Sequence, residues 1–232
     1  MTEEVDAIMF DAGGTLIGLK KPREEVFLEV LKQHGLSSTT DAVRKAYAKA
    51  DRHFDKDFAS LKGNSEGAFW ARYDAYILKS LGLKTDSEAF AKDVGKAFDE
   101  IMPGVSNWVP YPEAIPILDL LKRRDFRLGV ISNATDLLTK VFDNLGMSKY
   151  FDFVVISDEV GVRKPSPEIF KIALKRANAT ASRSLYVGDM LEVDVVGAKK
   201  AGMNAVLVDR SDAYPDARCL RVKDLNFFRT FI

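Results

Sequence analysis

Five short apolar runs limit the folds available to this chain. The first is followed by Asp11 and a pair of glycines, and each of the other four is preceded by a stretch with apolar residues at helical spacing. Strands that alternate with helices predict a parallel sheet covered on both faces, which is a Rossmann-like α/β core. The predicted strands are 7–10, 127–131, 153–156, 184–187 and 205–208, and the predicted helices are 113–124, 136–145, 167–177 and 193–201.

The pattern changes between residues 17 and 104, where helical spacing continues without a strand candidate. The expected organisation is a core of residues 1–16 and 105–232, with an all-helical cap of residues 17–104 inserted after the first strand. Both ends of the insertion return near Asp11, so we expect it to hinge as a lid over that carboxylate. Four helices are expected in the cap, at 23–34, 41–61, 67–81 and 87–102, closed by Gly35, Gly63, Gly82 and Pro103.

The charge and composition of the chain argue against nucleic acid or a membrane as its binding partner. Lys plus Arg and Asp plus Glu each count 34, so no overall field attracts nucleic acid or an anionic membrane. No apolar run approaches the roughly 20 residues that span a bilayer, and the first residues lack the pattern of a secretory signal. The single cysteine, Cys219, cannot form an internal disulfide, which suits a reducing compartment. We expect a soluble, cytoplasmic protein that acts on a small molecule.

Candidate site residues follow the predicted strands, because ligands of open parallel sheets bind outside the carboxyl ends of the strands. Three of these residues are carboxylates. Asp11 is the candidate nucleophile and a metal ligand, Asp189 is a second ligand, and Asp194 either binds the metal directly or orients a metal-bound water. Oxygen ligands suit Mg²⁺, and Mg²⁺ supplies the positive charge that phosphoryl transfer needs. The sequence therefore predicts a Mg²⁺ site for phosphoryl transfer.

Polar groups beside the carboxylates are expected to hold the phosphoryl oxygens. The backbone N–H groups of Gly14 and Thr15 are predicted to bind them, together with the side chains of Ser132 and Asn133. Lys164 is expected to bind phosphate as well and to neutralise the charge that phosphate shares with the nucleophile. A small phosphorylated molecule is the predicted substrate.

Four segments of the chain together resemble the four motifs of the haloacid dehalogenase superfamily. They are FDAGGTL at 10–16, ISN at 131–133, GVRKPSPEIF at 161–170 and VGDMLEVDVVGAKKAGM at 187–203. The resemblance covers essentially the whole chain, and the helical insertion resembles the C1-type cap of that family. The resemblance implies a Mg²⁺-dependent phosphatase that works through an aspartyl-phosphate.

Gly13 departs from the family pattern. Family phosphatases carry a second aspartate at this position, which protonates the leaving group and later activates water. Glycine has no side chain for either task, although its backbone carbonyl could still ligate Mg²⁺. A missing general acid typically removes roughly two to four orders of magnitude of rate. The loss matters least for leaving groups that need little protonation, such as those of aryl or acyl phosphates.

Gly13 leaves three alternatives open. Metal-independent 2-haloacid dehalogenases of the family carry an aromatic residue at this position, and phosphonate-cleaving members carry a small one. Asp189 and Asp194 argue against the dehalogenase, because carboxylates beside Asp11 would repel it without a cation between them. No lysine of the insertion stands out as the imine-forming group of phosphonate cleavage. The third alternative is a non-catalytic protein that binds phosphate-containing ligands.

Overall fold

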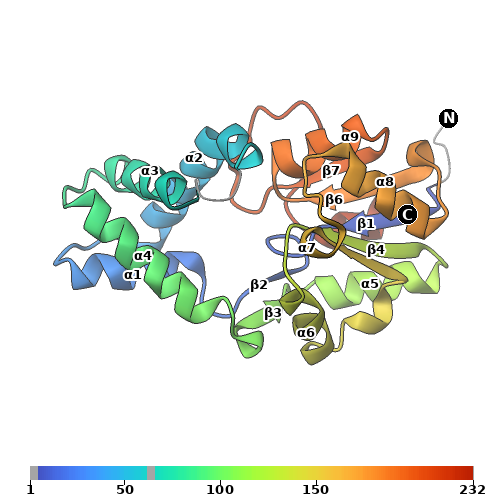
Figure 1. Ribbon diagram of the computed structural model, residues 1–232, viewed down its shortest axis with the longest axis horizontal. Coiled ribbons are helices and arrows are strands. Elements are labelled where there is room, and N and C mark those ends of the chain that lie inside the picture. The colour runs from blue at the N-terminus through green and yellow to red at the C-terminus, as the bar shows by residue number, and fades with distance from the viewer. Residues whose placement is uncertain (1–4, 62–65, 232) are drawn as a thin grey trace. The chain divides into compact units, whose positions relative to one another are not determined.

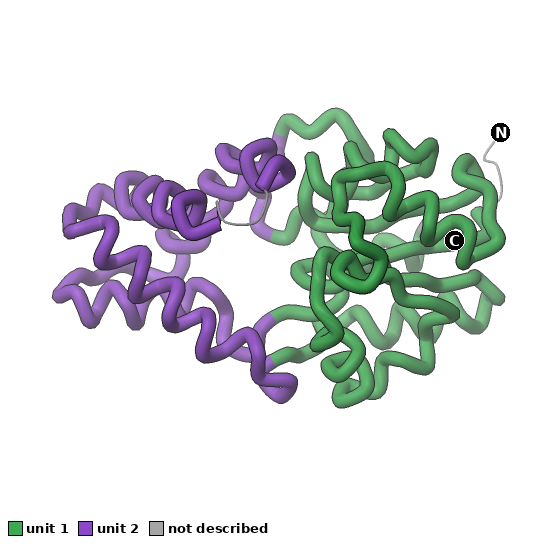
Figure 2. The backbone as a smooth tube through the Cα atoms, in the orientation of Figure 1, with its two compact units in different colours: residues 1–18, 108–210, 216–232 green, residues 19–107, 211–215 purple. Residues whose placement is uncertain are grey.

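The chain divides into two compact units, shown in Figure 2. The computed structural model describes residues 5–61 and 66–231. The first unit contains Met1–Gly18, Trp108–Arg210 and Asp216–Ile232, and the second contains Leu19–Asn107 and Ser211–Pro215. The structure therefore divides the chain after Gly18 and after Asn107, slightly later than the sequence predicts. It also groups Ser211–Pro215 with the helical unit, although the sequence pattern assigns those residues to the core.

The first unit is built on a six-stranded sheet in which every strand pair is parallel. The strand order is β5-β4-β1-β6-β7-β8, so β1 lies between β4 and β6. The carboxyl ends of these three strands therefore meet at one edge of the sheet, where the candidate site residues follow them. The strands are β1 Ala7–Phe10, β4 Arg127–Ser132, β5 Phe153–Ile156, β6 Ser184–Gly188, β7 Asn204–Val208 and β8 Leu220–Val222.

Helices cover both faces of this sheet, which confirms the α/β class. Figure 1 shows α8 and α9 on one side of it and α5 and α6 on the other. The helices are α5 Ala114–Arg123, α6 Leu137–Asn144, α7 Ser157–Val160, α8 Pro167–Ala177, α9 Gly197–Lys200 and α10 Phe228–Phe231. Short 3₁₀ turns lie at η2 Val105–Asn107, η3 Ser148–Tyr150, η4 Ala181–Arg183 and η6 Leu225–Phe227.

One helix of the core differs from its prediction. The segment predicted as a helix at 193–201 begins earlier, as the π-helix η5 Leu191–Val196, and becomes α-helical only in α9. The N–H groups of Asp194 and Val195 both donate to the carbonyl of Met190. A π-turn carries one more residue than an α-turn, and such turns are frequent at functional sites.

The second unit holds the four helices that the sequence predicts. They are α1 Arg23–Gln33, α2 Thr40–Ala59, α3 Glu66–Ser80 and α4 Ser87–Ile101. Phe27 and Phe90 pack edge to face in their shared core, with ring centroids 5.0 Å apart. Gly35 and Gly82 follow α1 and α3 as predicted, and Gly63 lies outside the described residues.

The expectation of no strand between residues 17 and 104 is wrong at its first residues. β2 Ile17–Leu19 pairs with β3 Trp108–Pro110 in a two-stranded sheet. Three residues are too few to show the alternation that marks a strand, and the same applies to β8. Among the described residues, no helix is both long enough and apolar enough to cross a membrane.

Phe228 fastens the C-terminal segment to the core. It is fully buried and packs edge to face against Phe10 of β1, with ring centroids 5.9 Å apart. We expect Phe228→Ala to lower the free energy of unfolding by about 3–5 kcal/mol, because it leaves a cavity beside the central strand. Urea denaturation measures this, with exposed Arg229→Ala as the control that should change little. A loss no larger than that of the control would show that the segment does not support the core.

Asp74 of α3 makes the stability of the protein depend on pH. Its side chain is buried, and burial raises the pKa of its carboxyl to about 7. The unfolded chain releases this proton near pH 4, whereas the folded chain keeps it until about pH 7, so the free energy of unfolding falls as pH rises between these values. Asp74→Asn should remove that fall and stabilise the protein at pH 8 by about 3–4 kcal/mol relative to its effect at pH 4.

Urea denaturation at both pH values measures the effect of Asp74→Asn. Asp99→Asn, an exposed change on α4, is the matched control and should shift stability equally at both. An Asp74→Asn effect that is the same at pH 4 and pH 8 would contradict a raised pKa at this carboxyl.

Candidate active site

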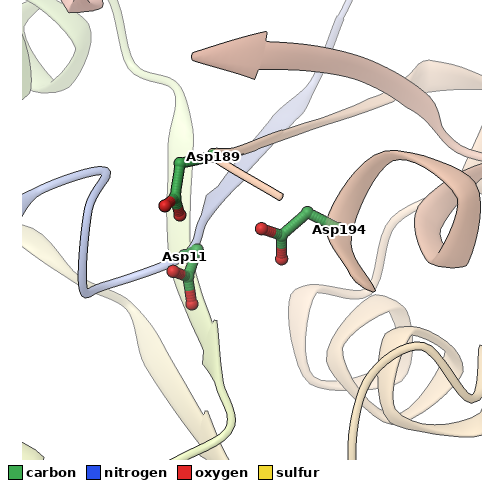
Figure 3. Close-up of side chains that lie close together, drawn as sticks. All are labelled: Asp11, Asp189 and Asp194. Carbon is green, nitrogen blue, oxygen red and sulfur yellow. The ribbon is translucent and has the colours of Figure 1, made fainter. Parts of the chain in front are cut away.

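Three carboxylates meet at the carboxyl edge of the core sheet (Figure 3). Asp11 follows β1, Asp189 follows β6, and Asp194 lies in η5. One ligand atom from each lies within 4.8 Å of the others. The adjacency of β1 and β6 brings Asp11 and Asp189 together, and the π-turn returns Asp194 to the same place.

Lys164 lies between two of these carboxylates. It is buried in the loop before α8, and its Nζ donates to Asp11 Oδ1 at 2.6 Å and to Asp194 Oδ1 at 2.7 Å. Burial by itself would lower the pKa of Lys164, but the two carboxylates outweigh burial and hold the pKa above its ordinary value. The side chain is therefore a fixed positive charge directly beside the candidate nucleophile.

Tyr186 of β6 completes this network, and no pattern in the sequence singles it out from the other core residues. Its hydroxyl accepts a hydrogen bond from Lys164 Nζ at 2.9 Å. The hydroxyl oxygen also lies 3.0 Å from Asp194 Oδ1 and 3.2 Å from the carbonyl of Ile131, either of which can accept its one proton. Burial raises the pKa of Tyr186 well above its ordinary value, so the group stays neutral and can donate.

Lys164 alone does not neutralise the carboxylates. Burial raises the pKa of Asp11 despite the opposing effect of Lys164, and burial together with the charges of Asp11 and Asp194 raises the pKa of Asp189 further. A cluster of carboxylate oxygens with excess negative charge fits a hard divalent cation such as Mg²⁺. Asp11 and Asp189 are the better-placed ligands. Asp194 Oδ1 already accepts from Lys164 and lies at hydrogen-bond distance from the Tyr186 hydroxyl, and Asp194 Oδ2 accepts from the N–H of Met190 at 3.0 Å.

The loop after Asp11 contains two glycines with different surroundings. Gly14 has a φ of +77°, and a Cβ there would lie 2.2 Å from Asp189 Oδ2, so only glycine fits. A Cβ on Gly13 would meet nothing within 4 Å, and its φ lies outside the left-handed region. The missing side chain at position 13 is therefore not required by the turn, and the space beside Asp11 can hold one.

The predicted phosphate-binding groups differ in the hydrogen bonds that they already form within the protein. The N–H of Gly14 donates to the carbonyl of Ile17 at 2.9 Å, so it is already used within the turn. Thr15 is fully buried, and its hydroxyl donates to Asp189 Oδ1 at 3.3 Å. Ser132 ends β4 and is buried at the carboxyl edge of the sheet.

Asn133 holds the loop that carries Lys164. Its Oδ1 accepts from the N–H of Lys164 at 2.8 Å, and its Nδ2 donates to the carbonyl of Lys164 at 3.0 Å. Both ends of the amide are therefore committed to the backbone of one residue. This role differs from the phosphate contact that the sequence predicts. It could be read only from the structure, because the two residues are 31 positions apart.

The site combines a buried carboxylate, a fixed cation and an oxygen-rich position for a metal ion. The carboxylate can attack phosphorus or carbon as a nucleophile. The cation and a metal ion can stabilise negative charge on the group that is transferred. Both histidines of the sequence, His34 and His53, lie in the helical unit, so the core offers no imidazole as an acid or base.

Known proteins are similar to this chain in sequence. The chain is 43% identical over 211 residues to a glyceraldehyde 3-phosphate phosphatase of Methanothermobacter thermautotrophicus, covering 88% of this chain and 85% of that one. It is 27% identical to haloacid dehalogenase-like hydrolase domain-containing protein 3 of Mus musculus, covering 90% of this chain and 84% of that one.

A solved structure has the same fold. The magnesium-bound HAD hydrolase YfnB of Bacillus subtilis superposes with a TM-score of 0.65 and 19% identity, covering 99% of both chains. The family model of haloacid dehalogenase-like hydrolases matches residues 5–202, which include the first three motifs, all but the last residue of the fourth, and the three carboxylates with Lys164. The chain belongs to the haloacid dehalogenase-like hydrolase family.

Proposed function

We propose that this protein is a Mg²⁺-dependent phosphatase of small phosphorylated molecules and that it works through a phosphorylated Asp11. The observation that carries the proposal is the buried Asp11 carboxylate, fixed by Lys164 and set beside Asp189 at the carboxyl edge of the sheet. The name of the relative at 43% identity, a glyceraldehyde 3-phosphate phosphatase, supports a phosphate ester as substrate.

Each residue of the site has a part in the proposed reaction. An Asp11 oxygen attacks phosphorus, the bond from phosphorus to the leaving oxygen breaks, and that oxygen takes a proton from water. A second water then attacks the phosphorus of the aspartyl-phosphate, which frees Asp11 and releases inorganic phosphate. Lys164 holds Asp11 in place and offsets negative charge throughout. The N–H of Thr15 and the hydroxyl of Ser132 are the donors for the phosphoryl oxygens.

Mg²⁺, when bound, supplies the positive charge that draws the phosphoryl oxygens toward the nucleophile. Asp11, Asp189 and the backbone carbonyl of Gly13 would hold it. Asp194 would orient a metal-bound water rather than bind the ion itself, because both of its oxygens already accept hydrogen bonds.

Gly13 determines which substrates react fast. Without an acid at this position, the leaving oxygen must depart with little protonation, so aryl and acyl phosphates are favoured over alkyl phosphates. A metal-independent dehalogenase is the second candidate, since Asp11 could equally attack a carbon that carries halide. The excess negative charge at Asp11 and Asp189 disfavours it, because a metal-free displacement would leave that charge unbalanced.

The proposed roles of Mg²⁺ and of Asp11 as nucleophile can be tested together. We expect hydrolysis of an aryl phosphate that requires Mg²⁺ and falls by at least about 10³-fold in Asp11→Asn, because the amide is not a nucleophile. Phosphate release is measured with Mg²⁺ and with chelator, and Asp11→Asn reports contaminating phosphatase. Activity equal to that of Asp11→Asn would contradict the proposal, and halide release from a 2-haloacid would then be measured.

The absence of a general acid at Gly13 can be tested by restoring one. Gly13→Asp should raise turnover of an alkyl phosphate roughly 10- to 100-fold and that of an aryl phosphate much less, because only the alkyl leaving group needs the proton. A Cβ at position 13 meets nothing within 4 Å, and the φ there lies outside the left-handed region, so the backbone accepts a residue with a side chain. Gly13→Asn is the matched control, since it has the same shape without the acid. Equal gains on both substrates, or equal gains from Asp and Asn, would contradict the role of protonation.

A further inference from the structure

Arg210 bonds the loop that carries the nucleophile. It lies beyond β7, two residues after Val208, and its Nε donates to the carbonyl of Gly14 at 3.0 Å. Its Nη2 donates to the carbonyl of Thr15 at 2.8 Å. The partners are 196 and 195 residues apart in sequence. β6 separates β1 from β7 in the sheet, so this side chain links two strand ends that are not neighbours.

Two other side chains hold the guanidinium group in place. The ring of Tyr111 stacks on it, with the guanidinium carbon 3.6 Å from the ring centroid. Glu113 forms an ion pair with it, with Oε1 2.7 Å from Nη2, in a geometry that is not that of a hydrogen bond. We call Arg210, Tyr111 and Glu113 the Arg210 cluster. The N–H of Tyr111 also donates to the carbonyl of Leu16 at 3.0 Å, so the cluster bonds the loop at a third carbonyl.

The opposite side of the same loop lies against Asp189. The Cα of Gly14 packs so closely on the Asp189 carboxylate that no Cβ fits, and the Thr15 hydroxyl donates to Asp189. The loop is therefore held between a candidate metal ligand on one side and the Arg210 cluster on the other. A displacement of the loop would therefore move Asp11 and Asp189 relative to each other.

The bond to Gly14 also strengthens a neighbouring donor. The carbonyl of Gly14 and the N–H of Thr15 belong to the same peptide unit. A cationic donor on that carbonyl polarises the unit and makes its N–H a stronger donor, as in other chains of hydrogen bonds. The N–H of Thr15 is the backbone group that the proposed function directs at a phosphoryl oxygen.

We propose that Arg210 is a positioning residue for phosphoryl transfer. It fixes residues 13–15 against Asp189, so that the Asp11 carboxylate and the N–H of Thr15 face the same phosphoryl group. It touches neither substrate nor metal, and this role rests on the proposed function. Lysine cannot replace it fully, because only the planar fork of arginine bonds two carbonyls while it stacks on an aromatic ring.

The test compares Arg210→Gln and Arg210→Lys with Arg127→Gln in the full chain. Arg127 is the matched control, since it also donates to a backbone carbonyl, that of Ala177, but lies at the amino end of β4. We expect Arg210→Gln to lower kcat on an aryl phosphate about 10- to 100-fold with a smaller change in KM, the loss typical of residues that orient a catalytic ligand. Arg210→Lys should recover part of kcat, and Arg127→Gln should leave it unchanged.

Amide hydrogen exchange over residues 12–17 gives a readout independent of turnover. Arg210→Gln should speed exchange there, whereas Arg127→Gln should not. A kcat unchanged by Arg210→Gln, or a kcat loss without faster exchange in this segment, overturns the inference while leaving the phosphatase proposal intact.

A wild-type rate equal to that of Asp11→Asn marks the failure of the phosphatase proposal instead. The binding of inorganic phosphate in the presence of Mg²⁺ then decides the role of Arg210. Weaker binding in Arg210→Gln than in Arg127→Gln would show that Arg210 positions residues 13–15 for binding phosphate, and equal binding overturns the inference.

Discussion

The rest of the site depends on the two ion pairs that the buried ammonium of Lys164 forms with Asp11 and Asp194. Placing an unpaired charge in a protein interior costs several kcal/mol, and so does each carboxylate buried beside it. Asp11 and Asp194 each bond the ammonium directly, so each charge is compensated by a neighbour at hydrogen-bond distance. Removal of Lys164 would leave both carboxylates without the cation that each of them contacts. Asp11, the proposed nucleophile, is thus held in place by the same contact with Lys164 that makes its burial possible.

The sequence predicts the frame of the molecule well because the frame depends on local patterns. β1, β5 and α8 have the bounds that apolar runs and helical spacing indicate, and the four cap helices lie where predicted. The patterns fail where an element is too short to repeat, as in β2, β3 and β8. They also fail at η5, because a π-turn shifts the phase of the helical spacing by one residue within a single turn.

The identities of the three central carboxylates and of Lys164 also follow from the sequence, because each stands directly after a strand or within a motif. Tyr186 and Arg210 do not, because their importance comes from contacts over long separations. Tyr186 is 22 residues from Lys164, and Arg210 is 196 residues from Gly14. A tyrosine inside a buried strand and an arginine after one have no local signature. Only the packing of β1, β6 and β7 brings them to the site.

Three residues that a motif presents as ligands act in this structure on other protein groups. Asn133 bonds the backbone of Lys164, the N–H of Gly14 bonds Ile17, and Asp194 accepts from Lys164, Tyr186 and Met190. Gly188 of the same motif is also constrained by contact with a protein group, because a Cβ there would lie 2.4 Å from the Asp194 carboxyl carbon. The residue type at a motif position can therefore be required for its contact with another residue of the site, and not only for direct contact with a metal or substrate. Few groups of this site touch the substrate in the proposed reaction, and many hold those few in register.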